Sequence, residues 1–410
     1  MSKNEELRKS DRQRRALVVG LGISGAAAAI SLKRAGWNPV VIEKASERRS
    51  GGYFIALFGA GKAAADRLGV LDFLHDRTAF KGVNYDMDRF GEWRPGLGFR
   101  DIPGEPWLML RGDVEKATFK AMPEDVEIRY STVPTKIEQD AGGVDVTLAD
   151  TAGGGVTTER FDLVVGADGL RSSVRKLAFG PHERYLHRLN YMLAAFQLDE
   201  GLGDLSPRDG ATLLEPGRSL WVFPFSDHAP TVLLGYQTDD VDAEFTEPPA
   251  VRARKAFGPR PTGDMLGAAL EAMEASDELL FDSVEQVHMD RWHKGRVVLV
   301  GDSAWCVTLY AGMGASAGLA GADLLGTMLG RHDDIGLALA EWQEQLRPFV
   351  DYYQKLGLDQ TAVFVPNSKQ IKLRRMFARG MAMPIASQVL RFINTHNKSG
   401  RMKDADIARA

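Results

Sequence analysis

Short apolar runs, each followed directly by a glycine, organise this chain. Residues 16–19, 163–165 and 297–300 are continuous runs of Ala, Leu and Val. Runs of this length and composition predict strands that are buried on both faces, as in a parallel sheet. After the first run, an alanine-rich segment stops at Gly36 and a second apolar run covers 39–42. Together these segments predict a β-α-β unit.

The pattern changes between about 180 and 285. Several segments alternate between apolar and polar residues, which predicts strands with one buried face. In one of them, 219–225, the period of two places Trp221, Phe223 and Phe225 on one strand face. We therefore expect a second, mostly antiparallel sheet inserted into the α/β fold.

The predicted fold is α/β: a Rossmann-like nucleotide-binding domain with an inserted α+β substrate domain and C-terminal helices. The nucleotide-binding domain is expected to be discontinuous, because the βα pattern returns after the insertion. The expected boundaries are 1–15 for a mobile tail, 16–80, 108–180 and 285–345 for the nucleotide-binding domain, 81–107 and 181–284 for the substrate-binding domain, and 346–410 for a C-terminal helical segment.

Composition narrows the possible functions. The chain has 410 residues, enough for two domains with substantial cores, and its formal net charge of −4 gives no reason to expect a nucleic acid partner. It has no run of about 18 apolar residues, so we expect no transmembrane segment. Its single cysteine, Cys306, leaves no internal disulfide and no cysteine set for a metal. We expect a cytoplasmic protein without a metal site.

The first apolar run leads into the glycine motif GLGISG at 20–25. Gly20 permits a tight turn, Gly22 lets the backbone approach a pyrophosphate, and Gly25 lets the next helix pack closely on the sheet. The N-terminus of that helix offers free N–H groups to a phosphate. Glu43 ends the next strand, about 20 residues later, where an acid hydrogen-bonds a ribose hydroxyl. These features predict dinucleotide binding rather than an ordinary turn in which glycine only packs.

The other two runs deliver acidic residues. Asp168 follows the second run in GADGLRS and can cap the helix after it. Asp302 follows the third run in GDSA, and the glycines Gly312 and Gly314 then open a long alanine-rich helix. The three motifs, in this order and each at the end of an apolar run, indicate bound FAD and oxygen chemistry.

With these motifs, residues of about 15–350 resemble the para-hydroxybenzoate hydroxylase family of group A FAD-dependent monooxygenases, which includes aromatic polyketide hydroxylases and tetracycline-inactivating monooxygenases. The resemblance implies that the nucleotide-binding domain binds FAD. It also implies that the N-terminus of the helix after Gly312 faces the flavin N1 and C2 oxygen, where it stabilises negative charge. The residues that the resemblance assigns to FAD are Gly20, Gly22, Ile23, Ser24, Gly25, Glu43, Lys44, Arg49, Arg111, Val133, Asp168, Asp302, Gly314, Ala315 and Ser316.

The resemblance also implies a reaction. NADPH or NADH binds transiently and reduces the flavin, O2 then forms a flavin C4a-hydroperoxide, and an aromatic or polycyclic small molecule is hydroxylated. The protein has to orient the substrate and exclude water. We assign no catalytic base, and we interpret His288 and His293 as surface or packing residues.

The substrate is expected between the inserted sheet and the flavin. Trp221, Phe223 and Phe225 offer flat apolar walls for it, although packing within the core of the sheet explains each of them equally well. Leu309 is a further candidate for substrate contact.

The third motif departs from the family pattern. Trp305 stands where a histidine is usual, Cys306 and Leu309 replace prolines, and Ser316 replaces an asparagine. We interpret Cys306 as a packed thiol rather than a nucleophile, because no histidine base is near it in sequence.

Other functions stay open. One is an FAD-dependent reductase or dehydrogenase of the same fold, and another is a low-turnover flavin-binding regulatory protein, which the altered segment 305–309 suggests. A related halogenase is disfavoured because the Trp-x-Trp-x-Ile-Pro motif is absent. Basic and apolar residues alternate over 369–379 and suggest peripheral membrane contact, although a solvated helix face is the commoner interpretation.

Overall fold

A six-stranded sheet contains all three apolar runs in the computed structural model, which describes residues 13–48, 52–96, 98, 106–381 and 406–408. The strand order is β17-β18-β11-β1-β2-β7, and every neighbouring pair is parallel except β17 and β18. The carboxyl ends of β1, β11 and β18 therefore meet at one edge. The bounds are β1 (Arg15–Val19), β2 (Asn38–Ile42), β7 (Glu127–Arg129), β11 (Leu163–Gly166), β17 (His293–Lys294) and β18 (Val297–Leu299).

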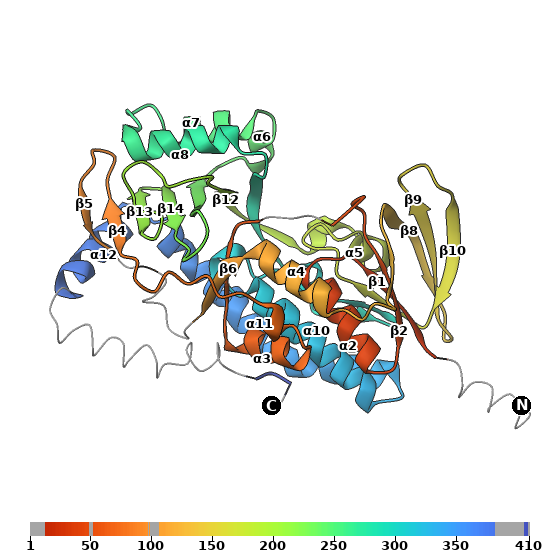
Figure 1. The fold of residues 1–410 in the computed structure, drawn as a ribbon. Coiled ribbons are helices and arrows are strands. Elements are labelled where there is room, and N and C mark those ends of the chain that lie inside the picture. The colour runs from red at the N-terminus through yellow and green to blue at the C-terminus, as the bar shows by residue number, and fades with distance from the viewer. Residues whose placement is uncertain (1–12, 49–51, 97, 99–105, 382–405, 409–410) are drawn as a thin grey trace, which may run out of the picture.

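Helices α2 and α10 pack closely against each other beside this sheet (Figure 1). Two glycines of α10 permit the close approach, because a Cβ on Gly318 would lie 2.4 Å from Ser24 Oγ and one on Gly326 would lie 2.0 Å from Ser31 Oγ. The long helix α11 packs along α10. The bounds are α2 (Ile23–Arg34), α3 (Gly59–Arg67), α4 (Arg111–Ala121), α5 (Ser173–Ala178), α9 (Asp302–Trp305), α10 (Gly314–Arg331) and α11 (Ile335–Phe364).

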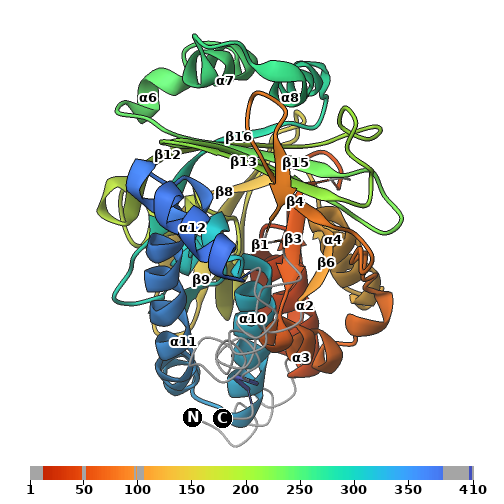
Figure 2. The same cartoon turned by 90° about the vertical axis from the view of Figure 1, so that its left-hand side faces the viewer.

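A seven-stranded sheet, mostly antiparallel, forms the upper part of the molecule (Figure 2). Its two faces bury different sets of side chains, because residues alternate along each strand. Val222 and Leu234 pack under helices α7 and α8, whereas Trp221, Phe223 and Leu233 face the opposite way. The bounds are β4 (Asn84–Met87), β5 (Trp93–Pro95), β12 (Leu186–Gln197), β13 (Gly210–Glu215), β14 (Arg218–Phe223), β15 (Thr231–Gln237), β16 (Leu280–Val287), α6 (Val241–Glu244), α7 (Pro249–Phe257) and α8 (Gly263–Ala275).

Smaller elements complete the fold. One sheet contains β8 (Thr132–Gln139), β9 (Val144–Asp150) and β10 (Val156–Phe161), and another pairs β3 (Phe54–Leu57) with β6 (Trp107–Leu110). The C-terminal helix α12 (Ser368–Met381) lies between α11 and the seven-stranded sheet (Figure 2). The predicted α/β class, with an inserted antiparallel sheet and C-terminal helices, is confirmed.

Candidate active site

The three glycine motifs touch one another at the carboxyl edge of the parallel sheet. Gly20 has a φ of +102°, and a Cβ there would lie 2.6 Å from the carbonyl oxygen of Ala167 in the second motif. A Cβ on Gly301 of the third motif would lie 2.3 Å from Ser24 Oγ in the first. Ser303 Oγ donates a hydrogen bond of 2.6 Å to the Gly166 carbonyl. The three motifs, each separated from the next by more than 100 residues in sequence, thus form one continuous backbone surface.

Glycines in these motifs have two distinct roles. A Cβ on Gly25 would lie 1.9 Å from the carbonyl oxygen of Gly20, so only glycine permits this helix to begin so close to β1. Gly22 and Gly314 instead face open space, because the nearest atom to a Cβ on Gly22 is Glu115 Oε1 at 3.7 Å and none lies within 4 Å of one on Gly314. The N-termini of α2 and α10 therefore present bare backbone to a cavity.

Two opposite charges line the same part of the cavity. Arg111, at the start of α4, forms an ion pair with Glu115, with 2.7 Å between Nη2 and Oε1. The Asp302 side chain lies deep in the protein, yet it is exposed to the cavity. Burial raises the pKa of its carboxyl, while Arg111 and a hydrogen bond with Cys306 act in the opposite direction.

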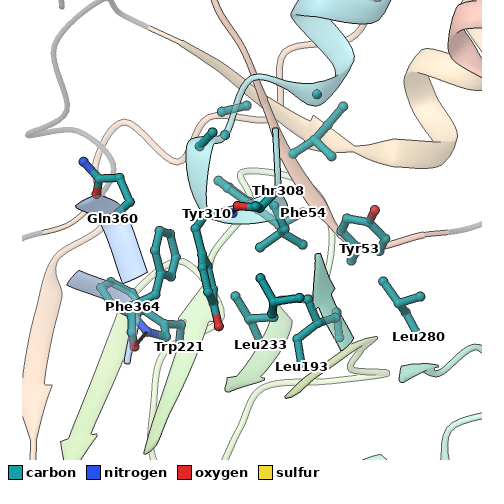
Figure 3. A pocket seen from close by; sticks show the side chains of 18 of the residues that line it. Tyr53, Phe54, Leu193, Trp221, Leu233, Leu280, Thr308, Tyr310, Gln360 and Phe364 are labelled. Carbon is teal, nitrogen blue, oxygen red and sulfur yellow. Dashed lines mark hydrogen bonds between the residues drawn. The ribbon is translucent and has the colours of Figure 1, made fainter. Parts of the chain in front are cut away.

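A cavity of about 940 Å³ lies between the parallel sheet and the seven-stranded sheet. Figure 3 shows Tyr53 and Leu280 at one side of it, Tyr310 near the middle, and Gln360 and Phe364 at the other side. Of the residues predicted to bind FAD, those that line this cavity are Gly22, Ile23, Ser24, Arg111, Asp302, Gly314 and Ala315.

Aromatic rings in mutual contact form one wall of the cavity. Phe54 stacks on Phe223 with ring centroids 4.2 Å apart, and Phe223 lies 6.3 Å from Trp221 in a nearly parallel orientation. Trp221 is 5.1 Å from Phe364, which stacks on Tyr310 at 4.9 Å. These rings come from β3, β14, α11 and the short 3-10 helix Leu309–Ala311 before α10, so an aromatic wall is assembled from four separate segments.

Burial keeps the protonated side chains of this cavity in their neutral forms. It raises the pKa of the Tyr53 phenol to about 12 and raises the pKa of the Tyr310 phenol further. The Tyr310 hydroxyl has no hydrogen-bond partner among the described residues. Burial, together with the charge of Asp302, also raises the pKa of the Cys306 thiol. These groups can donate hydrogen bonds, but they are not bases or nucleophiles at neutral pH.

Glu43 and Asp168 hold backbone in place beside the cavity. The Glu43 carboxylate accepts hydrogen bonds from the N–H groups of Leu21 at 2.8 Å and Ala45 at 3.0 Å, so it fixes the glycine loop. The Asp168 carboxylate accepts hydrogen bonds from the N–H groups of Ser173 at 2.6 Å and Val174 at 3.1 Å, the first two of helix α5, whose N-cap residue is Ser172. Asp168 therefore performs the capping role proposed from sequence, at the border of the cavity.

The remaining described residues predicted for FAD do not line the cavity. Ser316 is fully buried, and its hydroxyl accepts a hydrogen bond of 3.2 Å from the N–H of Phe58. Val133 is half-buried near the start of β8, and Lys44 is exposed. Arg49 lies outside the described residues.

Three of the four residues predicted for the substrate line the cavity, namely Trp221, Phe223 and Leu309. Phe225 does not, because β14 ends at Phe223 and the chain has left the strand before Phe225. Its buried ring lies 6.1 Å from that of Phe54 and contributes to the packing behind the wall.

These features fit FAD. A Cβ would project into open space from Gly314, at a helix N-terminus, and Arg111 supplies a cation beside the first glycine loop. Helix N-termini and an arginine together bind phosphate, and the N-terminus of α10 suits a flavin edge that becomes negative on reduction. Within the described residues, no cluster of three or more His, Cys, Asp or Glu that could hold a metal is found, nor is any helix long and apolar enough to cross a membrane.

Comparison with known proteins agrees with this geometry. A family model described as an FAD binding domain matches residues 13–332. A flavin-dependent monooxygenase from an unidentified prokaryote is 31% identical over 357 residues, covering 83% of this chain and 87% of the relative. The chain belongs to the para-hydroxybenzoate hydroxylase-like FAD-dependent monooxygenases. It is therefore an FAD-dependent enzyme.

Solved structures share the fold of this monooxygenase. The tetracycline destructase Tet(51) superimposes with a TM-score of 0.74 at 24% identity, covering 94% of this chain and 98% of the other. HpxO from Klebsiella pneumoniae, complexed with FAD and uric acid, gives 0.72 at 20% identity, covering 96% of each chain.

Sequence reasoning missed most of the side chains on the outer part of the cavity. Phe364 belongs to a helix that carries no recognisable motif. Arg374 lies in the basic and apolar segment 369–379, whose pattern indicates a solvated or membrane-contacting helix face rather than part of a cavity. Tyr310 and Thr308 could have been identified from the sequence, since both lie inside the third motif. Thr308 has a φ of +73°, and a non-glycine residue in this region often marks a functional loop.

Proposed function

We propose that this monooxygenase uses NADPH or NADH and O2 to hydroxylate a flat aromatic or polycyclic small molecule. The observation that supports the substrate class is the aromatic wall of Phe223, Trp221 and Phe364 across the cavity from the FAD-binding motifs. Flat apolar walls favour planar apolar ligands through stacking and the hydrophobic effect. The structural relatives include a tetracycline destructase and HpxO, which was solved in complex with FAD and uric acid, and both tetracycline and uric acid are fused-ring compounds.

FAD bound at the three motifs would supply hydride acceptance from the nicotinamide nucleotide and the activation of O2. The chain's own residues have simpler tasks. The wall orients the substrate rings, and the apolar lining keeps water away from the reacting centre. The N-terminus of α10 stabilises negative charge at its end of the cavity.

We assign hydrogen-bond donation to the buried phenol of Tyr53. Tyr53 lies at the cavity with its pKa raised to about 12, so its phenol stays protonated and can donate to a substrate or intermediate oxygen. Asp302 belongs to the third motif, and the resemblance gives it a role in binding FAD rather than in proton transfer.

The test measures the visible spectrum of the purified protein, followed by NADPH and NADH oxidation and O2 uptake with a panel of phenols and polycyclic compounds. A flavin spectrum with substrate-stimulated oxidation and matching O2 uptake is expected. Oxidation that is stimulated equally without O2, with reduction of the added compound, would replace this proposal by a reductase. A flavin spectrum with no stimulation by any compound would favour the regulatory protein.

A further inference from the structure

Helices α11 and α12 close the outer part of the cavity, away from the FAD-binding motifs. The lining residues that these helices and their connection contribute are mostly apolar, with the amides of Gln360 and Gln370 among them. Among the described side chains of this group, Arg374 is the one that carries a charge. A single cation in an otherwise neutral, largely apolar part of a ligand cavity is a candidate specificity group.

Arg374 is held in place by the aromatic wall. Its guanidinium carbon lies 5.5 Å from the ring centroid of Trp221, a distance at which a cation and an indole attract each other. Only 21% of its side chain is exposed. The ring and the burial together restrict the guanidinium to one small region of the cavity.

Most N–H donors of the Arg374 guanidinium are not used by contacts within the described residues. Its only polar partner among the described residues is Asp86, which accepts a hydrogen bond of 3.3 Å from Nη2. A guanidinium carries several N–H donors in a planar fork, so most of them are not used by this contact. Leaving such donors unpaired in a partly buried place is costly unless water or a ligand accepts them.

The acidic residues of the cavity do not compete for Arg374. Asp282 receives two hydrogen bonds from Arg171, at 2.8 and 2.6 Å, and the nearly buried carboxylate of Glu285 lies within 4.0 Å of both Arg171 and Arg188. The charge of Arg374 is shared with Asp86, which does not line the cavity, so what Arg374 offers to a ligand is its remaining N–H donors. The acids on β16 are matched by arginines of their own.

We propose that Arg374 anchors an anion subsite, which binds a carboxylate or enolate carried at one end of the substrate. This inference rests on the proposed function, because it assumes that the ring system of the substrate lies along the wall formed by Phe223, Trp221 and Phe364. The planar guanidinium matches a carboxylate in a two-point contact, which an ammonium cannot make. An anion held at this outer end directs the remainder of the molecule toward Tyr53 and the FAD-binding motifs.

The test compares two ligands that share a ring system and differ in charge, 1-hydroxy-2-naphthoate and 1-naphthol. Their dissociation constants are measured by isothermal titration calorimetry on the FAD-loaded protein at pH 7.5. The naphthoate is expected to bind about tenfold more tightly or better, because a hydrogen bond between two charged groups is stronger than one between neutral groups. Arg374→Gln is expected to abolish this preference. Arg374→Lys is expected to retain part of the preference because the charge is kept and the fork is lost.

Lys372→Gln is the matched control, since Lys372 lies on the same helix, is exposed and does not line the cavity. It removes the same charge and is expected to leave the preference intact. Equal affinity for the two ligands, failure of the naphthoate to bind, or an equal loss in Lys372→Gln would overturn the proposal. Binding requires no turnover, so a charge preference without hydroxylation would reject only the proposed function, and hydroxylation without a preference would reject only the subsite.

Discussion

The two sides of the cavity differ in composition, because one is lined mainly by backbone and the other by aromatic side chains. On the side of the parallel sheet, the surface consists of glycines, helix N-termini and loops, and a Cβ added at Gly25 or Gly301 would have no space. On the side of the seven-stranded sheet, the surface consists of stacked aromatic side chains such as Trp221 and Phe223. A backbone surface tolerates almost no change, whereas a surface of side chains can be altered without loss of the fold. This contrast leads to predictions that differ in size and in the property affected.

The largest effect is expected at Gly25. In Gly25→Ala the new methyl group meets the carbonyl oxygen of Gly20 at 1.9 Å, so α2 has to move away from β1. Backbone displacement in the core costs about 3 kcal/mol or more, and FAD content should fall with stability. Thermal unfolding and the flavin absorbance of the purified protein measure both effects. Gly155→Ala is the control, because no atom lies within 4 Å of its Cβ position; equal behaviour of the two variants would disprove the packing argument.

Gly314→Val should separate cofactor binding from folding. A Cβ added at Gly314, at the N-terminus of α10, has no atom within 4 Å. The free energy of unfolding of the apoprotein should therefore lie within about 1 kcal/mol of the wild-type value. The side chain would project to where the flavin is expected, and the dissociation constant for FAD should rise by about tenfold or more. Fluorescence titration of the apoprotein with FAD measures this constant. An unchanged constant would mean that α10 does not face the cofactor.

The aromatic wall should respond more weakly and in a different property. Phe223→Leu keeps a large apolar side chain but loses the stacked contacts with Phe54 and with the substrate, which contribute about 0.5–1.5 kcal/mol each. We expect KM for an active substrate to rise about two- to tenfold with FAD affinity unchanged. Phe281→Leu is the control, because Phe281 packs on the opposite face of the sheet. A similar rise in KM in both variants would assign the effect to the sheet rather than to the wall.

The same contrast explains what the sequence could predict. The roles of Gly20, Gly22 and Gly25 follow from local spacing, because each motif fits between one strand and the helix after it. The shared face of Trp221 and Phe223 could also be predicted from the sequence, since a period of two identifies one strand face. The contribution of Phe364 and Arg374 to the cavity could not be predicted, because it depends on how α11 and α12 pack against the distant sheet. Phe225 shows the limit of periodicity, which gives the face of a residue but not the end of its strand.

The smallest effect is expected at Tyr310, and it concerns a polar atom within the aromatic wall. The Tyr310 hydroxyl is buried without a hydrogen-bond partner among the described residues, so Tyr310→Phe removes a desolvated group and keeps the stacking on Phe364. The free energy of unfolding, measured with urea, should be unchanged or higher by about 1 kcal/mol. Tyr236→Phe is the matched control on the opposite face of the same sheet, because the Tyr236 hydroxyl donates a hydrogen bond of 2.8 Å to Glu244.

Tyr236→Phe should lower the free energy of unfolding by about 1–2 kcal/mol, since it leaves a buried carboxylate oxygen with one partner fewer. If Tyr310→Phe were destabilised as much as this control, the Tyr310 hydroxyl would have an acceptor in solution. If Tyr310→Phe instead keeps its stability but loses affinity for an active substrate, the unpaired hydroxyl is a donor held for that substrate. The aromatic wall would then contain a polar contact that resembles the pre-placed donors of the opposite side of the cavity.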